Sequence, residues 1–158
     1  MNHRPRIDAL VTRMIACGLD ISPIESAPWI AGVEFRLGTQ FPADFRDFVT
    51  RYSFPLLELK DVEIFSNLGD MSEYDLTHAP FRDPYMSPWL IRHGLIHVGF
   101  PYIGNYDPIC LELSSAPSDK GASVVRLNHE DILMERPTVH RTSVSSSFLA
   151  LLEQQIDA

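Results

Sequence analysis

The hydrophobic pattern of the chain changes period near residue 55, and this change is the strongest constraint on its fold. Before that point apolar residues recur every three or four positions, as they do along one face of an α-helix. Helices are therefore expected over three stretches, 7–17, 28–38 and 42–52. Gly18 supplies a C-terminal stop for the first helix, and Pro28 and Pro42 stand where the other two would start.

After residue 55, short runs rich in β-branched residues predict strands. The runs cover 62–64, 95–100, 109–113 and 123–127, with turns expected at 104–107 and 114–121. The stretch 77–89 holds Pro80, Pro84 and Pro88 among aromatic residues, which argues against regular helix or central strand. We interpret this stretch as a long ordered loop. One of Ser145–Ser147 is expected to cap a closing helix.

Helices followed by an antiparallel meander and a final helix indicate an α+β fold. A chain of 158 residues, 45% of them hydrophobic, is long enough to bury a sizeable core. We expect a single domain over 1–158, with N-terminal helices packed on a mostly antiparallel sheet and a C-terminal helix. Cys17 and Cys110 are too few for a disulfide framework, so a cytoplasmic location is expected.

The formal net charge of −8 limits the partners that the chain can bind. It argues against a nucleic acid or an anionic membrane surface, and no apolar run approaches the roughly 20 residues of a membrane span. The first third is neutral, and the excess acid is densest between Glu58 and Asp83. This region is either a solvated face that keeps the protein soluble or a docking surface for a cationic partner.

The sequence lacks the motifs of common catalytic and metal sites. His93 and His97 have the spacing of a zinc pair, but on a strand four residues span about 13 Å, too far for one ion. His129-Glu130-Asp131 follows a strand, and Asn128 or Asp131 is expected to cap a short turn there. Cys110 lies within a strand, where a thiol usually packs as an apolar group. The sequence therefore predicts a protein that is not an enzyme and has no cofactor or metal site.

An aromatic and proline-rich segment with neighbouring acidic and turn residues is the strongest candidate for a binding surface. Tyrosine, tryptophan and arginine are enriched at the energetic centres of protein interfaces, and tyrosines beside prolines or turns are expected to be exposed. The candidate partner-binding residues are Asp70, Glu73, Asp75, Asp83, Tyr85, Tyr102, Asn105, Tyr106 and Asp107.

Several short motifs occur in a characteristic order. Glu34-Phe35-Arg36-Leu37-Gly38 precedes Phe41-Pro42-Ala43-Asp44-Phe45, the expected strands flank a turn at 104–107, and 124–130 ends in Asn128-His129-Glu130. This order resembles the SUKH superfamily, the Smi/Knr-type domain, over residues 24–156. The chain departs from the family pattern at 52–55, where Tyr-Ser-Phe-Pro replaces the usual Asn-Gly.

The resemblance implies an α+β fold and a role in binding rather than catalysis. Many bacterial members are similar to immunity proteins, so the chain is expected to bind and neutralise a toxin domain, for example a nuclease with a basic groove. One alternative is a housekeeping regulatory interaction domain of the Smi/Knr type. Another is an enzyme or small-ligand binder that uses His97, Asp107 and His129 across the sheet. The sequence does not predict the oligomeric state.

Overall fold

The fold is known from a computed structural model that describes residues 2–102, 105–113 and 121–157. The helices within these ranges are α1 (Arg4–Ala16), α2 (Ile30–Leu37), α3 (Ala43–Arg51), α4 (Met86–Arg92), α5 (His129–Leu133) and α6 (Phe148–Ile156). A 3₁₀ helix, η1, covers Ala79–Phe81. The predicted turn at 104–107 is described only from Asn105 onward, and of the turn at 114–121 only Gly121 is described.

The strands form one large antiparallel sheet and one small one. β1 (Ser22–Pro23) pairs with β2 (Tyr52–Ser53) outside the main sheet. The main sheet contains, in sequential order, β3 (Leu57–Glu58), β4 (Val62–Ile64), β5 (Leu95–Pro101), β6 (Ile109–Glu112), β7 (Ser123–Leu127) and β8 (Arg141–Ser145). Every neighbouring pair is antiparallel, which confirms the predicted meander and the α+β class. None of the helices in the described part of the chain is long and apolar enough to cross a membrane.

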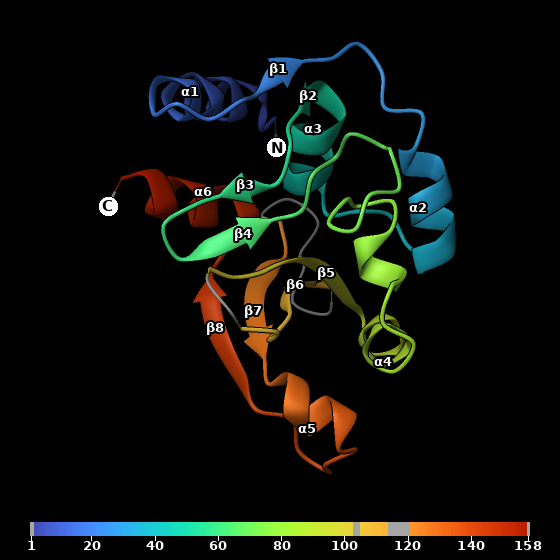
Figure 1. Ribbon diagram of the computed structural model, residues 1–158. Coiled ribbons are helices and arrows are strands. Elements are labelled where there is room, and N and C mark those ends of the chain that lie inside the picture. The colour runs from blue at the N-terminus through green and yellow to red at the C-terminus, as the bar shows by residue number, and fades with distance from the viewer. Residues whose placement is uncertain (1, 103–104, 114–120, 158) are drawn as a thin grey trace.

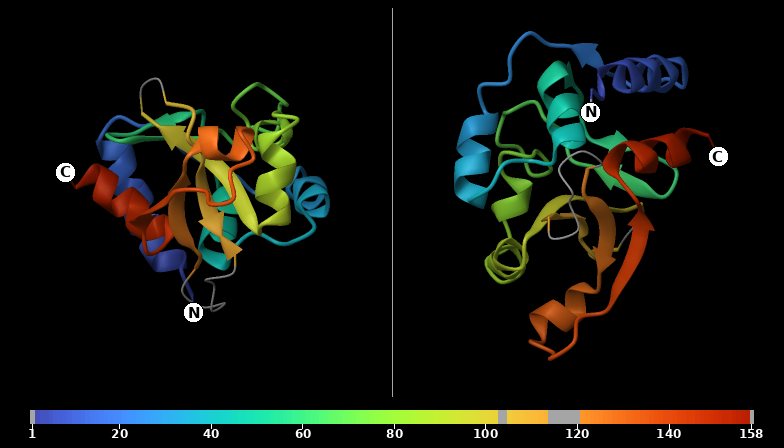
Figure 2. Two further views of the ribbon diagram at one scale, coloured as in Figure 1. Left: turned by 90° about the horizontal axis from the view of Figure 1, so that it is seen from below. Right: turned by 180° about the vertical axis from the view of Figure 1, so that it is seen from behind.

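Apolar residues cover both faces of the sheet. On one face Ile96, Leu111 and Val124 join the main core, to which α1, α2, α3 and α6 contribute. Because successive strand residues point to opposite faces, Cys110 and Val125 pack instead against α4 and α5. Figure 2 shows the two groups of helices on opposite sides of the sheet. The larger group buries most of the core, and the smaller group covers the second face only in part.

The three N-terminal helices form where the sequence predicts helix, but α1 begins earlier, at Arg4, and α2 begins at Ile30, so the predicted start at Pro28 is wrong. The apolar stripe of α1 is buried, and Gly38 ends α2 in the left-handed conformation with φ 74°. Pro42 precedes α3, whose Phe45 packs edge-to-face on Phe148 of α6 at 4.7 Å between ring centroids. The hydroxyl of Ser147 accepts a hydrogen bond from the backbone N–H of Ala150 and so caps α6. The prediction that one of Ser145–Ser147 caps the start of the last helix is confirmed.

The interpretation of 77–89 as a loop is wrong, because this stretch contains η1 and the first part of α4. Pro88 is the third residue of α4, in the first helical turn, where backbone N–H groups have no partner within the helix. A proline there removes no intrahelical hydrogen bond. The carboxylate of Asp83 accepts hydrogen bonds from the backbone N–H groups of Tyr85 and Met86, which starts the helix.

Two further elements carry no clear sequence signal. β8 has the sequence Arg-Thr-Ser-Val-Ser, and its first residues are exposed, so apolar alternation is lacking. α5 is only five residues long and is capped by Asn128, whose side chain accepts a hydrogen bond from the backbone N–H of Asp131. The predicted cap at Asn128 is confirmed, although it starts a helix rather than an isolated turn.

Gly99 of β5 lies against the backbone of β4 with no room for a side chain. A Cβ atom at Gly99 would lie 2.0 Å from the backbone carbonyl oxygen of Glu63. The register of β5 with β6 shifts between His97 and Gly99, so the strand is irregular at the same place. A side chain at residue 99 would therefore separate two paired strands.

We expect Gly99→Ala to lower the free energy of unfolding by about 2 kcal/mol or more, because backbone must move to admit the methyl group. The matched control is Gly32→Ala. A Cβ at Gly32 meets nothing within 4 Å, and alanine should stabilise α2 by roughly 0.5–1 kcal/mol. Chemical denaturation of both variants measures the difference, and equal midpoints would contradict the close approach at Gly99.

Candidate functional site

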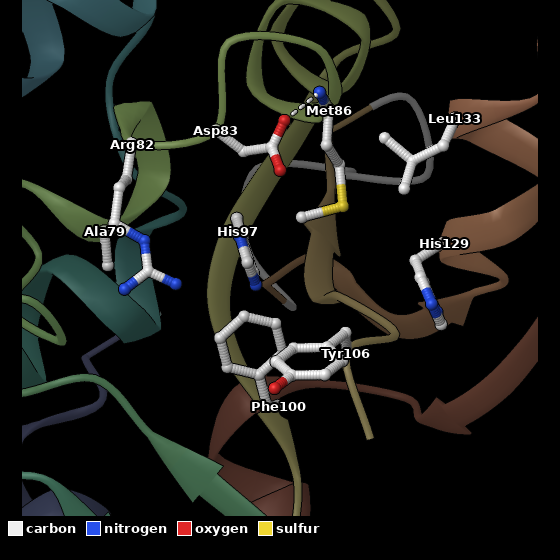
Figure 3. Close-up of a pocket in the computed structure, with 9 residues that line it drawn as sticks. All are labelled: Ala79, Arg82, Asp83, Met86, His97, Phe100, Tyr106, His129 and Leu133. Atoms are coloured by element: carbon white, nitrogen blue, oxygen red, sulfur yellow. Dashed lines mark hydrogen bonds between the residues drawn. The ribbon is translucent and has the colours of Figure 1, made fainter. Parts of the chain in front are cut away.

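A cleft of about 310 Å³ opens on the second face of the sheet, where α4 and α5 leave it partly uncovered. Figure 3 shows its lining side chains, which come from η1 and the turn after it, α4, β5, the segment before β6, and α5. They are Ala79, Arg82, Asp83, Met86, His97, Phe100, Tyr106, His129 and Leu133. Apolar and aromatic walls with a few polar groups are typical of binding pockets.

His97 forms the buried part of this cleft. Its side chain is 3% exposed and lies edge-on to the rings of Phe65 and Phe100, at 4.8 and 4.7 Å between centroids. Nε2 lies 2.9 Å from the carbonyl oxygen of Gly99. Burial lowers the pKa of His97 to about 3, so the ring is neutral at physiological pH. Because a carbonyl oxygen can only accept, Nε2 carries the proton and Nδ1 presents a lone pair.

Asp107 and His129 form a hydrogen-bonded pair at another side of the cleft. One carboxylate oxygen of Asp107 lies 2.6 Å from Nδ1 of His129 and also accepts its backbone N–H at 3.0 Å. The other oxygen accepts from Nε of Arg126 at 2.9 Å. Burial raises the pKa of Asp107, but the hydrogen bonds from His129 and Arg126 outweigh it and the net pKa is lowered. The carboxylate therefore holds the His129 ring in one orientation.

A second carboxylate, Asp131, anchors the helix that carries His129. It is 1% exposed and binds the guanidinium of Arg136 at 2.5 Å. It also accepts the backbone N–H of His140 and contacts Nδ1 of that ring, both at 2.9 Å. These interactions tie α5 to the segment that leads into β8. Hydrogen bonds from His140 and Arg136 lower the pKa of Asp131 to about 2.

Arg82 connects the cleft to a second, shallower hollow. Its guanidinium forms an ion pair with Glu73 and lies 5.4 Å from the ring centroid of Tyr74. The hollow measures about 230 Å³ and shares Arg82, Phe100 and Tyr106 with the cleft. Its other lining residues are Glu63, Tyr74, Pro101 and Asn105. Cleft and hollow therefore form one continuous surface, with Tyr106 between them.

Some of the residues proposed from the sequence meet at this surface. Asp83 and Tyr106 line the cleft, Asn105 lines the hollow, and Glu73 binds Arg82. Tyr85 and Tyr102 are 76% and 41% exposed but line neither. Asp70 is exposed, and its carboxylate accepts the backbone N–H of Ser72.

Asp75 and Asp107 cannot serve as the partner contacts that the sequence suggested, because both carboxylates are buried. Asp75 is 0% exposed and accepts hydrogen bonds from the hydroxyls of Ser66 and Thr77 and from the backbone N–H groups of Gly69 and Thr77. Asp107 is 7% exposed and is held by His129 and Arg126. Both acids fix loops of the protein itself.

Five residues that line the cleft were not among the sequence candidates: Ala79, Arg82, Met86, Phe100 and Leu133. Arg82 and Phe100 lie in the aromatic segment, so the enrichment of arginine and aromatic residues at interfaces could have added them. Met86 and Leu133 offered no signal, because α4 was interpreted as loop and α5 was not expected.

Two other residues that the sequence analysis considered for chemistry, His93 and Cys110, do not line the cleft. His93 stacks on Trp89 at 3.9 Å between ring centroids and lies away from His97 in the turn before β5. Cys110 is fully buried in β6, and burial raises the pKa of its thiol. Across the described ranges, no cluster of three or more histidine, cysteine or acidic residues could hold a metal ion.

The Asp131 anchor makes stability depend on pH in a defined direction. Because its folded pKa of about 2 lies below its ordinary value of 3.8, its contribution is present above about pH 4 and is lost as pH falls toward 2. We expect Asp131→Asn to be less stable than the natural protein at neutral pH, with the difference shrinking toward pH 2. Denaturation curves between pH 2 and 7 test this. Glu130→Gln removes the same charge from an exposed neighbour and is the control.

Neither protein-family models nor curated protein sequences match this chain. The resemblance to the SUKH superfamily therefore stays a prediction that depends on the motifs themselves. Two of these motifs meet in the fold, because the carboxylate of Glu34 accepts the backbone N–H of Phe41 at 2.7 Å and binds Arg46.

Proposed function

We propose that this chain is a non-catalytic protein-binding domain that docks its partner on the surface formed by the cleft and the adjoining hollow. The observation that carries the proposal is the position of Tyr106, which is 68% exposed and lines both concavities beside Arg82. Exposed tyrosine and arginine next to a concave apolar site are the usual energetic centre of a protein interface.

Exposed apolar residues nearby support the same proposal. Leu133 is 47% exposed on the cleft side of α5, and Met134 beside it is 67% exposed. Tyr74, 39% exposed, lines the hollow. Such side chains at or beside the cleft and the hollow give a partner apolar area to bury, with Arg82 and Glu73 available for polar contacts at the rim.

Within this class, we propose an immunity protein that binds and blocks a toxin domain with a basic surface, in the cytoplasm. The resemblance to the SUKH superfamily and the net charge of −8 support this choice, because an acidic protein is attracted over long range to a basic groove. The alternative is a regulatory interaction domain of the Smi/Knr type. Co-expression with the toxin encoded beside it distinguishes them: growth should be restored and the two proteins should co-purify.

The juxtaposition of His97 and His129 at one cleft favours a small-ligand binder as the second candidate function. The two rings lie on different elements, β5 and α5, and Asp107 orients one of them. The described lining contains no serine, threonine, cysteine or lysine that could act as a nucleophile. A protein that binds small molecules at the cleft but captures no toxin or regulatory partner would support this second candidate instead.

We expect Tyr106→Ala to weaken binding of the co-purified partner by about 10- to 100-fold, because an exposed aromatic anchor is lost. The control is Ile15→Ala, which truncates another exposed apolar residue, 48% exposed. It lies on α1, far from α5 at the other end of the molecule (Figure 1). Calorimetric titration measures both. Equal effects of the two variants would place the interface elsewhere.

We expect the exposed carboxylate of Asp70 to contribute less to partner binding than Tyr106 does. Asp70→Lys should slow association at low salt by less than about tenfold and leave dissociation almost unchanged, because rim charges act mainly on the rate of encounter. Stopped-flow kinetics at several salt concentrations measures both rates. A large increase in the dissociation rate would contradict this assignment and show that Asp70 lies inside the interface.

A further inference from the structure

His97, which lines the cleft, carries a hydrogen-bond acceptor that the fold itself does not use. Nδ1 of His97 is fully buried, and no donor from the described part of the chain reaches it. Because Nε2 donates to the carbonyl of Gly99, the tautomer is fixed and Nδ1 cannot donate. A buried polar atom without a partner costs free energy, and a ligand that supplies a donor removes that cost.

Other polar groups of the cleft offer acceptors as well, whereas the guanidinium of Arg82 is a donor that is paired with Glu73. Nδ1 of His129 faces Asp107, so Nε2 is the ring nitrogen left to contact a ligand. Asp83 uses one carboxylate oxygen to cap α4. Figure 3 shows His97, Asp83 and His129 around the same opening, with Phe100 and Tyr106 as aromatic walls. The site therefore suits a flat apolar group that donates and does not accept.

The charged and polar groups of the cleft further limit which kinds of ligand can bind there. Arg82 lines the cleft beside Asp83, so a lysine or arginine side chain would meet a like charge next to a carboxylate that already caps α4. A carboxylate would place a negative oxygen against the lone pair of His97. A phenol would bring lone pairs of its own toward Nδ1 of His97 and the carboxylate of Asp83. An indole has one N–H donor, no acceptor and a flat aromatic body.

We propose that the cleft is a socket for a tryptophan side chain of the partner, whose indole N–H donates to Nδ1 of His97 while the ring packs among Phe100, Tyr106, Met86 and Leu133. This assignment rests on the proposed protein-binding function and identifies the group that the partner inserts. The volume of about 310 Å³ is at the small end of ligand pockets, as expected for one side chain.

Free indole tests the socket without any partner. We expect indole to bind with a dissociation constant on the order of 1 mM, and 1-methylindole, which lacks the donor, to bind about tenfold more weakly. In nitrogen-15 NMR spectra, indole should shift the Nδ1 resonance of His97, and 1-methylindole should not. Absence of indole binding, or equal binding of the two compounds, would overturn the proposal.

Variants separate the socket from folding. Leu133→Glu should weaken indole binding at least fivefold by placing a charge in the apolar wall. Met134→Glu is the matched control, because Met134 is the next residue, is also exposed, and does not line the cleft. His97→Phe keeps an aromatic ring beside Phe65 and should abolish the preference for indole over 1-methylindole. If it is unstable, the two surface variants and the NMR shift still decide.

Competition with the partner identifies the source of the indole group. Indole should displace the co-purified partner, whereas 1-methylindole at the same concentration should displace it about tenfold less effectively. If indole binds at His97 without displacing the partner, the natural ligand is a free small molecule and the tryptophan assignment is wrong. If no partner co-purifies, the proposed protein-binding function fails, and the indole titration still decides whether the cleft is a donor-selective socket.

Discussion

The structure depends on one electrostatic constraint: a carboxylate taken out of water must have its oxygens satisfied by hydrogen bonds or cations. Five carboxylates are buried in the described part of the chain, and all but Asp44, which accepts the backbone N–H of its neighbour Phe45, hold a segment that lacks regular structure. The buried acids are Glu34, Asp44, Asp75, Asp107 and Asp131. Four of them bind a backbone N–H from a distant or looped segment as well as a side chain, and such bonds fix backbone in a way that apolar packing alone does not.

The same constraint positions the cleft. Asp107 joins the segment before β6 to the start of α5, so Tyr106 and His129 face one opening. Asp131 then holds the other end of α5 to the segment before β8. Because α5 is short, side-chain anchors rather than helix length determine where it lies on the sheet. The cleft lies on the second face beside α4 and α5, which contribute Met86, His129 and Leu133 to its lining, with His97 of β5 as its buried part.

The sequence predicted the parts of the fold that follow from hydrophobic period. The stripes of α1 and α3 and the strands from β4 to β7 were expected because apolar spacing alone specifies them. The prediction from sequence was wrong where capping side chains and tertiary pairing, rather than apolar spacing, determine the secondary structure. Prolines were taken to exclude helix at 77–89, yet Pro88 occupies a first-turn position that tolerates it, and Asp83 supplies the cap. The register of β8 depends on tertiary pairing that its own polar sequence does not reveal.

The candidate site, like the fold, was predicted from the sequence only in part. Composition indicated the aromatic segment, but it could not distinguish an acid on the surface from an acid that holds a loop. Asp75 and Asp70 lie in the same acidic stretch, and only the fold shows that one is fully buried and the other exposed. Sequence charge is a sum over both kinds, so the value of −8 overstates the acid available to a partner.

The difference between surface acids and buried acids bears on the proposed recognition of a partner at the cleft. Acids that are already saturated by internal donors add to the long-range field, but their oxygens are not free to bind a partner's cations. Short-range selectivity must then come from groups that the fold leaves available, and at the cleft these are aromatic faces, Arg82 and the lone pair of His97. A basic partner would be attracted by the whole molecule, yet be held by an apolar group with a donor. Attraction and selection would thus depend on different residues, so each can be altered without the other.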